Sequence, residues 1–156
     1  MNFGKGTSRP PPAHTAFYRE CKERLPKEKR IARFRADSAF YQAELINELE
    51  KDNVFWTITA DQDAAVSAII KDMPEDAWKE PRKGCGYELA EAVHTMNKTK
   101  KSFRLVIKRE LRKQKDLFDL VTEKYHHYAV ATNWPEEEKD AQAVLTWHNQ
   151  RGQAVK

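Results

Sequence analysis

The sequence predicts an α/β protein: a strand–helix–strand–helix unit, then a β-rich basic segment, then a C-terminal helix. Three observations predict this class. Between residues 30 and 73, two runs of β-branched and aromatic residues alternate with two amphipathic stretches, the pattern of a parallel α/β unit. Three strand-like runs follow at 87–95, 102–110 and 125–132. A last amphipathic stretch then begins near residue 133.

The first elements follow from local composition. Residues 1–14 are rich in Gly and Pro with little to bury, which predicts an extended leader reaching to about residue 16. We expect a short helix over residues 17–25. The alternating apolar positions of residues 31–36 predict a strand with one buried face. Apolar residues at helical spacing over 39–51 predict an amphipathic helix.

The remaining elements are bounded by capping and turn residues. Residues 54–60 are almost wholly β-branched and aromatic, which predicts a buried strand. Asp61 is expected to cap the next helix, and residues 97–100 are expected to form a hairpin turn. Asn133 is a suitable cap for the last helix, and Pro135 suits an early helical position.

Composition limits the class of protein. A chain of 156 residues has the length of one domain, and with 40% hydrophobic and 33% charged residues it buries a modest core. Cys21 and Cys85 have no CxxC spacing, so neither a disulfide framework nor a zinc site is indicated. There is no apolar run of about 20 residues and no secretory signal, so we expect no membrane partner and a cytoplasmic location.

Charge is distributed in blocks. Residues 98–115 hold nine Lys or Arg and one acid, whereas residues 37–76 hold ten acids and two Lys. Blocks of this kind suit a protein that binds phosphates on one surface and holds carboxylates on another. Charge alone favours the simpler interpretation, in which the blocks are solvated faces.

Asp37 is the position that chemistry singles out. It follows the predicted strand at a strand-to-helix junction, where open α/β sheets place functional groups. From position alone, an Asp before Ser at a helix start is more often a cap than a ligand.

Four ordered segments make the chain resemble bacterial insertion-sequence transposases of the DDE type. Residues 30–41 (RIARFRADSAFY) resemble the family's "R-x-R-A-D-S-x-x-Y/F" segment. The resemblance continues in residues 59–63 (TADQD) and 94–101 (HTMNKTKK). Residues 147–152 (WHNQRG) resemble the "W-Y-N-Q-R-G" stretch on the family's Glu-bearing helix. The likeness covers most of the chain, from about residue 17 to residue 152.

The resemblance implies a partial RNase H-like core with an inserted β-rich segment. It divides the chain into an extended leader (1–16), the partial core (17–73), a β-rich basic insertion (74–132) and the start of the Glu-bearing helix (133–156). Asp37 would be the second catalytic carboxylate of the Asp–Asp–Glu triad. It would also be a ligand of Mg²⁺ or Mn²⁺ in two-metal strand cleavage and transfer.

DNA at the transposon ends is the implied partner. The basic residues of the insertion, from Lys98 to Arg112, would contact its phosphates, with the foremost candidates Lys98, Lys100, Lys101 and Arg104. Arg151 resembles a family arginine near the active site. It is expected either to touch DNA phosphate or to interact with a helix C-terminus.

The chain departs from the family's pattern at both ends. No Asp precedes Asp37, and Val155 and Lys156 stand where the triad's Glu is expected. One catalytic carboxylate of three is therefore present, and a single Asp holds Mg²⁺ weakly. We expect a fragment of a transposase, with intact transposase as a possible homo-oligomeric partner and with no turnover alone. The alternatives are a DNA-binding remnant that interferes with intact transposase, or a degenerate reading frame without function.

Overall fold

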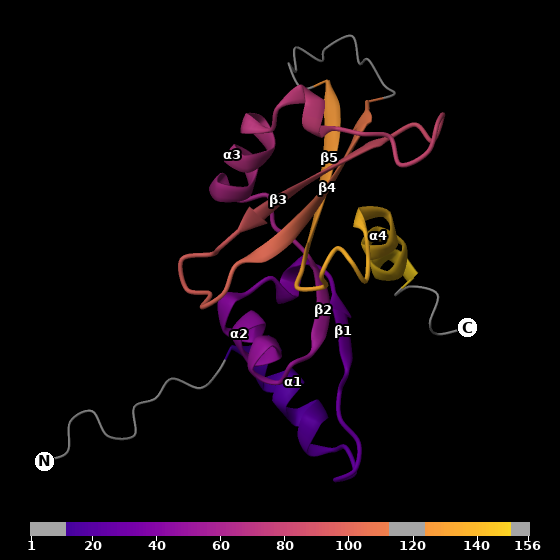
Figure 1. Ribbon diagram of the computed structural model, residues 1–156. Helices are drawn as coiled ribbons and strands as arrows, with labels where there is room; N and C mark the ends of the chain where they lie inside the picture. Colours follow the sequence, from indigo (N-terminus) through magenta and orange to yellow (C-terminus); the bar gives the residue numbers. More distant parts are fainter. Residues whose placement is uncertain (1–11, 113–123, 151–156) are drawn as a thin grey trace, which may run out of the picture.

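One mixed five-stranded sheet forms the centre of the molecule (Figure 1). The structure, a computed structural model, describes residues 12–112 and 124–150. The strand order is β1-β2-β5-β4-β3, with β1 parallel to β2 and all other neighbours antiparallel. The strands are β1 (Arg33–Ala36), β2 (Phe55–Thr59), β3 (Glu88–His94), β4 (Phe103–Leu111) and β5 (Tyr125–Thr132). The predicted α/β class is confirmed, because helices and a mixed sheet share one structure.

The parallel pair β1–β2 is joined by a helical crossover. β1 leads into a short 3-10 helix, η1 (Ser38–Phe40), and then into α2 (Ala43–Lys51). The apolar side chains of α2 lie on one stripe, which is buried against the sheet. Asn53 adopts a left-handed conformation with φ 55° and turns the chain into β2. The expected strand–helix–strand unit is therefore present.

Helices cover the two faces of the sheet unequally (Figure 1). α1 (Ala13–Glu23), α2 and α3 (Ala64–Asp72) lie on one side, and α4 (Ala141–Asn149) lies on the other. Because neighbouring residues of a strand point to opposite faces, Trp56 and Ile58 face the three helices whereas Thr57 faces α4. α4 is thus the only helix in the described part of the chain that covers this face.

Two apolar clusters result from this arrangement. The larger lies between the sheet and α1–α3, and its fully buried side chains include Trp56, Leu45 and Ile107. The smaller lies under α4 and contains the buried residues Leu89, Val106, Val130, Val144 and Leu145. Both clusters contain side chains of β4 and β5, so these two strands contribute to the cores on both faces.

The predicted basic insertion shares its sheet with the predicted core. β5 lies between β2 and β4, so residues 74–132 extend the sheet that residues 33–59 begin. The short 3-10 helix η2 (Glu75–Ala77) leads the chain across to β3. The expected boundary at residue 74 separates two segments of the sequence, but both segments contribute strands to one continuous sheet.

Three boundaries expected from the sequence were wrong: the end of the leader, the cap of α3 and the start of the last helix. α1 begins at Ala13, so the expected leader of residues 1–16 overlaps a helix; residues 1–11 lie outside the described part. α3 is capped by Asp63 rather than Asp61, because the Asp63 carboxylate accepts a hydrogen bond from Val66 N at 2.9 Å. Asp61 precedes the helix.

The last helix begins later than residue 133. Asp140 caps α4 by accepting a hydrogen bond from Ala143 N at 2.9 Å. Asn133 instead binds β2, where its side chain accepts from Trp56 N at 2.9 Å and donates to Val54 O at 2.8 Å. A capping residue recruited by a neighbouring strand is not free to start a helix.

α1 is fastened to α2 by charged side chains. Tyr18 donates a hydrogen bond to Asp52 at 2.8 Å, and Lys22 donates to the same carboxylate at 2.6 Å. Arg19 forms an ion pair with Glu48. Burial raises the pKa of Asp52, but the hydrogen bonds from Lys22 and Tyr18 outweigh it and hold this pKa below its ordinary value.

None of the helices in residues 12–112 and 124–150 is long and apolar enough to cross a membrane.

Truncation of Leu45 should strongly destabilise the protein. Leu45 is 0% exposed between α2 and the sheet, so Leu45→Ala leaves a cavity and should lower the free energy of unfolding by about 2–5 kcal/mol. Val93→Ala is the control, because Val93 is 73% exposed and its loss should change the stability by less than about 0.5 kcal/mol. Urea denaturation measures both. Equal effects of the two substitutions would contradict the placement of α2 on the sheet.

Candidate functional site

Asp37 lies directly after β1, at the carboxyl end of the parallel pair. Its side chain is exposed, and its Oδ1 accepts a hydrogen bond from Ala39 N at 3.0 Å. Asp37 is thereby the cap of η1. The capping interpretation is confirmed, and the exposed carboxylate also lies at the sheet edge where ligands bind in open α/β sheets.

The end of α4 is held against the strand that leads to Asp37. Arg35 donates a hydrogen bond through Nη1 to Trp147 O at 2.6 Å. Its guanidinium also lies over the Trp147 ring, 4.7 Å from the centroid. Arg35 binds a backbone carbonyl of the last turn of α4, where a cation is favourable. The segments that resemble the "R-A-D-S" and "W-Y-N-Q" motifs are thus in contact.

His148 fixes the orientation of α4 from within. It is 0% exposed, and its Nδ1 lies 2.7 Å from Thr57 Oγ1 while its Nε2 lies 2.9 Å from Thr59 Oγ1. Thr59 Oγ1 is also 3.2 Å from Tyr128 OH. The sequence analysis did not reveal these partners. The signal was present, because two threonines two positions apart on a strand point to the same face.

The described residues near Asp37 do not fit a divalent metal ion by themselves. Mg²⁺ needs several oxygen ligands in near-octahedral geometry. Asp37 is one carboxylate, and one of its oxygens already accepts a backbone hydrogen bond. Within residues 12–112 and 124–150 there is no group of three acidic, His or Cys side chains that could hold a metal ion. No chemical step through a metal follows from these residues.

A turn rich in lysine connects β3 and β4. Lys98, Lys100 and Lys101 have exposed side chains, whereas Thr99 between them is buried. The side chain of Asn47 on α2 binds the backbone of this turn, donating to Lys98 O at 2.9 Å and accepting from Lys100 N at 3.0 Å. Figure 1 shows the turn beside α2. The predicted hairpin turn is confirmed. Its three lysine side chains are exposed, and that of Lys101 also lies near Glu50.

Acidic residues of α2 lie on the inner side of the lysine turn. Two hollows border the turn, one of about 530 Å³ beside Lys98 and one of about 420 Å³ beside Lys100 and Lys101. Glu44 lines both. Lys101 Nζ lies 3.9 Å from Glu50 Oε2 but keeps 70% of its side chain exposed. These carboxylates make the two hollows unfavourable for an anion.

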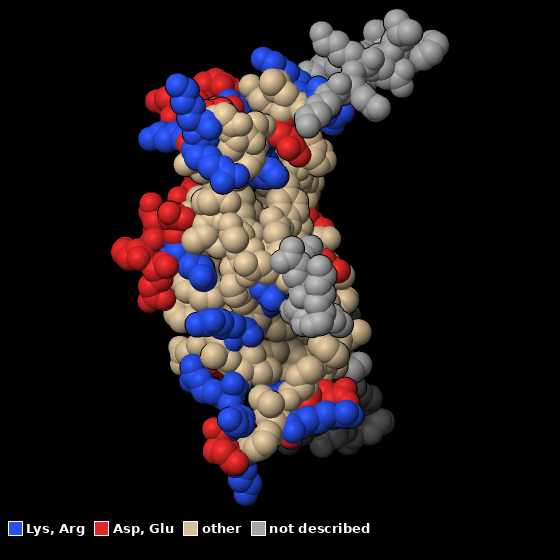
Figure 2. All heavy atoms as spheres, turned by 90° about the vertical axis from the view of Figure 1, so that its right-hand side faces the viewer, with Lys and Arg blue, Asp and Glu red and all other residues tan. Residues whose placement is uncertain are grey.

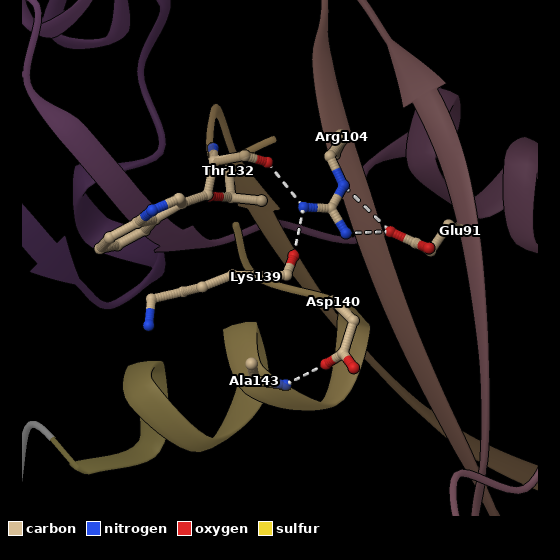
Figure 3. A network of polar contacts seen from close by, with 7 residues as sticks. Glu91, Arg104, Thr132, Lys139, Asp140 and Ala143 are labelled. Atoms are coloured by element: carbon tan, nitrogen blue, oxygen red, sulfur yellow. Dashed lines mark hydrogen bonds and ion pairs between the residues drawn. The ribbon is translucent and has the colours of Figure 1, made fainter. Parts of the chain in front are cut away.

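Arg104 makes structural contacts with neighbouring elements (Figure 3). Its Nη1 donates hydrogen bonds to Trp134 O at 2.6 Å and to Lys139 O at 3.0 Å, and its Nε donates to Glu91 Oε1 at 3.0 Å. The side chain is 16% exposed. Arg104 thus ties β4 to β3 and to the segment that leads into α4. These contacts leave little of the guanidinium for DNA.

Arg109 is likewise occupied. Its side chain is 5% exposed and lies between two aromatic rings, 4.4 Å from the Trp78 centroid and 4.2 Å from that of Tyr125. It donates to both carboxylate oxygens of Glu75 at 3.0 and 2.8 Å and to Glu88 at 2.9 Å. Arg109 belongs to the run from Lys98 to Arg112 that is expected to contact phosphates, but in the structure its guanidinium is buried and paired with two carboxylates. Trp78 is buried beside it.

The surface around α4 carries both signs of charge. On the face that Figure 2 shows, Lys and Arg are interspersed with Asp and Glu. This mixture agrees with the simpler interpretation of solvated faces for much of the charge. Arg151 lies outside the described residues. Of the predicted DNA-binding residues that the structure describes, the three lysines of the turn are exposed, and so is Arg112 at the end of the basic run.

Comparison of the chain with protein-family models and with curated proteins finds no match.

Removal of Arg104 should lower stability more than DNA affinity. Arg104→Ala leaves the Glu91 carboxylate and two backbone carbonyls without this donor, at a cost of about 1–3 kcal/mol in the free energy of unfolding. Arg82→Ala, at an exposed position, removes the same charge and should have little effect on stability. Thermal denaturation followed by circular dichroism compares them. Unchanged stability with weakened DNA binding would instead return Arg104 to the DNA-binding set.

Stability should fall when the pH drops below about 4.5. The hydrogen bond from Arg109 is the largest effect on Glu75 and lowers its pKa below the ordinary value of 4.5. The folded protein thus holds this proton more weakly than the unfolded chain, so stability is present above pH 4.5 and is lost as the pH falls through the folded pKa. Urea denaturation at a series of pH values should show a smaller acid loss for Glu75→Gln. Equal slopes for both proteins would contradict this assignment.

Proposed function

We propose that this chain is a domain of a DDE-type insertion-sequence transposase and takes part in DNA transposition by binding DNA at transposon ends. The family assignment is supported by the four ordered motifs of the sequence, of which the first and last are in contact through Arg35 and Trp147. It is further supported by the strand–helix–strand unit with Asp37 at its carboxyl end, which suits a partial RNase H-like core. Bacterial DNA lies in the cytoplasm, so we propose that location.

The observation that carries the proposal is the exposed lysine turn. It places Lys98, Lys100 and Lys101 on a segment that resembles the family and is fixed to α2 by Asn47. Lysine side chains neutralise phosphates and release the counterions of DNA, which provides affinity without sequence specificity. The charge and exposure of the turn support DNA binding. Arg104 and Arg109 instead stabilise the fold that carries the turn.

We propose that the chain alone neither cleaves nor joins DNA strands. Asp37 would be its part of the family's triad, and a lone carboxylate would bind Mg²⁺ or Mn²⁺ weakly. The exposed lysine turn also favours a second candidate function. In that function the chain occupies transposon ends and interferes with intact transposase by competition or by mixed assembly. A lysine turn without a grouped set of metal ligands in the described residues suits that role.

The lysine turn should determine DNA affinity and its salt dependence. Replacement of Lys98, Lys100 and Lys101 by Ala should weaken binding to a 30-bp duplex and reduce the slope of log affinity against log salt by about 3, since each phosphate contact contributes about 0.9. Fluorescence anisotropy at several salt concentrations measures both quantities. The control replaces three other exposed lysines, Lys71, Lys79 and Lys83, with the same change of net charge. No salt-dependent affinity of the unmodified chain would overturn the proposed function.

Strand transfer should be absent from the purified chain. The assay uses the two ends of the insertion sequence whose DNA encodes the chain, with Mg²⁺ or Mn²⁺ present. We expect no cleaved or joined product, and Asp37→Ala should leave DNA affinity within about twofold because the position adds no phosphate contact. Strand transfer that Asp37→Ala abolishes would contradict the proposal of an inactive chain and would support the family.

A further inference from the structure

The lysine turn is fixed at its backbone by one side chain from a distant part of the chain. Asn47 lies on α2, 51 positions before Lys98 and 53 before Lys100. Its amide donates to Lys98 O at 2.9 Å and accepts from Lys100 N at 3.0 Å. A side-chain amide that binds a carbonyl and an N–H in this way replaces the pairing of a neighbouring strand. The two contacts fix the position of the turn on α2.

Thr99 fixes the same turn from inside. It is 8% exposed, and both its N and its Oγ1 donate hydrogen bonds to Met96 O at 3.1 Å. The backbone between Met96 and Lys100 is therefore held by contacts on its inner side. The flanking side chains of Lys98, Lys100 and Lys101 remain exposed. The backbone of the turn is thus fixed by hydrogen bonds, while the three lysine side chains extend into solvent.

Fixed Cα positions matter because the three ammonium groups repel one another. Like charges within four residues favour conformations that spread them apart, and a turn without anchors would adopt such conformations. Binding of phosphates to such a turn then includes the entropic cost of ordering it. A turn that is ordered before binding avoids this cost, so its anchor raises the affinity without touching the ligand.

The acids near Asn47 determine the side from which DNA approaches. Glu50 is engaged with the Trp56 ring nitrogen at 2.9 Å and with Lys101, and Glu48 pairs with Arg19 and Lys22. Glu44 is exposed. All three line the hollow between α2 and the turn, which therefore disfavours phosphate. The outer side of the turn is the one that suits a phosphodiester backbone.

We propose that Asn47 is a positioning residue for DNA binding: it holds the lysine turn in the conformation that meets the phosphates of the DNA backbone. This inference rests on the proposed DNA-binding function. It assigns to α2, which carries no ligand contact of its own in the proposal, control over the affinity of a turn about 50 positions away.

The test measures the affinity of the full chain for a 30-bp duplex by fluorescence anisotropy over a range of salt concentrations. Asn47→Ala keeps all three lysines, so affinity should fall on the order of tenfold while the salt slope stays unchanged. Asn47→Ser keeps a polar group that cannot bridge two backbone groups, and it should behave alike. Gln142→Ala is the matched control, since it removes an amide from α4 that binds Tyr87 at 2.6 Å on the opposite face.

A second readout separates positioning from general destabilisation. Hydrogen exchange at the Lys100 amide should be slow in the unmodified chain and markedly faster in both Asn47 variants, while amides of β4 and β5 keep their protection. Unchanged affinity in both variants, with affinity still lost when the three lysines are replaced, would overturn the role of Asn47 and leave the proposed function in place. No salt-dependent binding by the unmodified chain would overturn the proposed function itself.

Discussion

The pairing of β2 with β5 joins the two halves of the molecule. Thr57, Ile58 and Thr59 pair with Thr132, Ala131 and Val130, so the parallel unit and the hairpin strands become one sheet. Side chains prolong this pairing beyond the strand, because Thr132 Oγ1 donates to Trp56 O at 2.7 Å and Asn133 binds the backbone on either side of Phe55. The face that α4 covers and the site at Arg35 both require this junction, since α4 contacts strands of each half.

The elements of the fold were predictable where local chemistry decides them. β2 is a run of β-branched and aromatic residues, and both of its faces are buried, so composition and environment agree. The start of α4 was not predictable, since Asn133 suits a helix cap and also suits the edge of β2, and only the tertiary contact selects between them. The order of the five strands likewise depends on pairings between distant segments, which local patterns do not encode.

The candidate site was predictable in position and less so in its members. Asp37 lies at the strand end that the pattern of residues 31–36 indicated. Counting basic residues could not separate the exposed lysines of the turn from Arg104 and Arg109, which are half-buried and buried. The difference is physical: the guanidinium groups of Arg104 and Arg109 each bind several acceptors at once, and such acceptors become available only when the sheet has formed. The three lysines of the turn, with a single point charge each, remain exposed to solvent.

The β2–β5 junction also has a consequence for the order in which the chain folds. The hydrogen bond from Thr132 to Trp56 spans 76 positions, so the inner edge of β2 has no strand partner until the chain has been synthesised past residue 132. At roughly 5–20 residues per second, the ribosome leaves this edge open for about 4–15 s. Long-range pairing of this kind slows folding, because the loop must close before the contacts form. During this interval the open edge of the apolar strand β2 is exposed to aggregation.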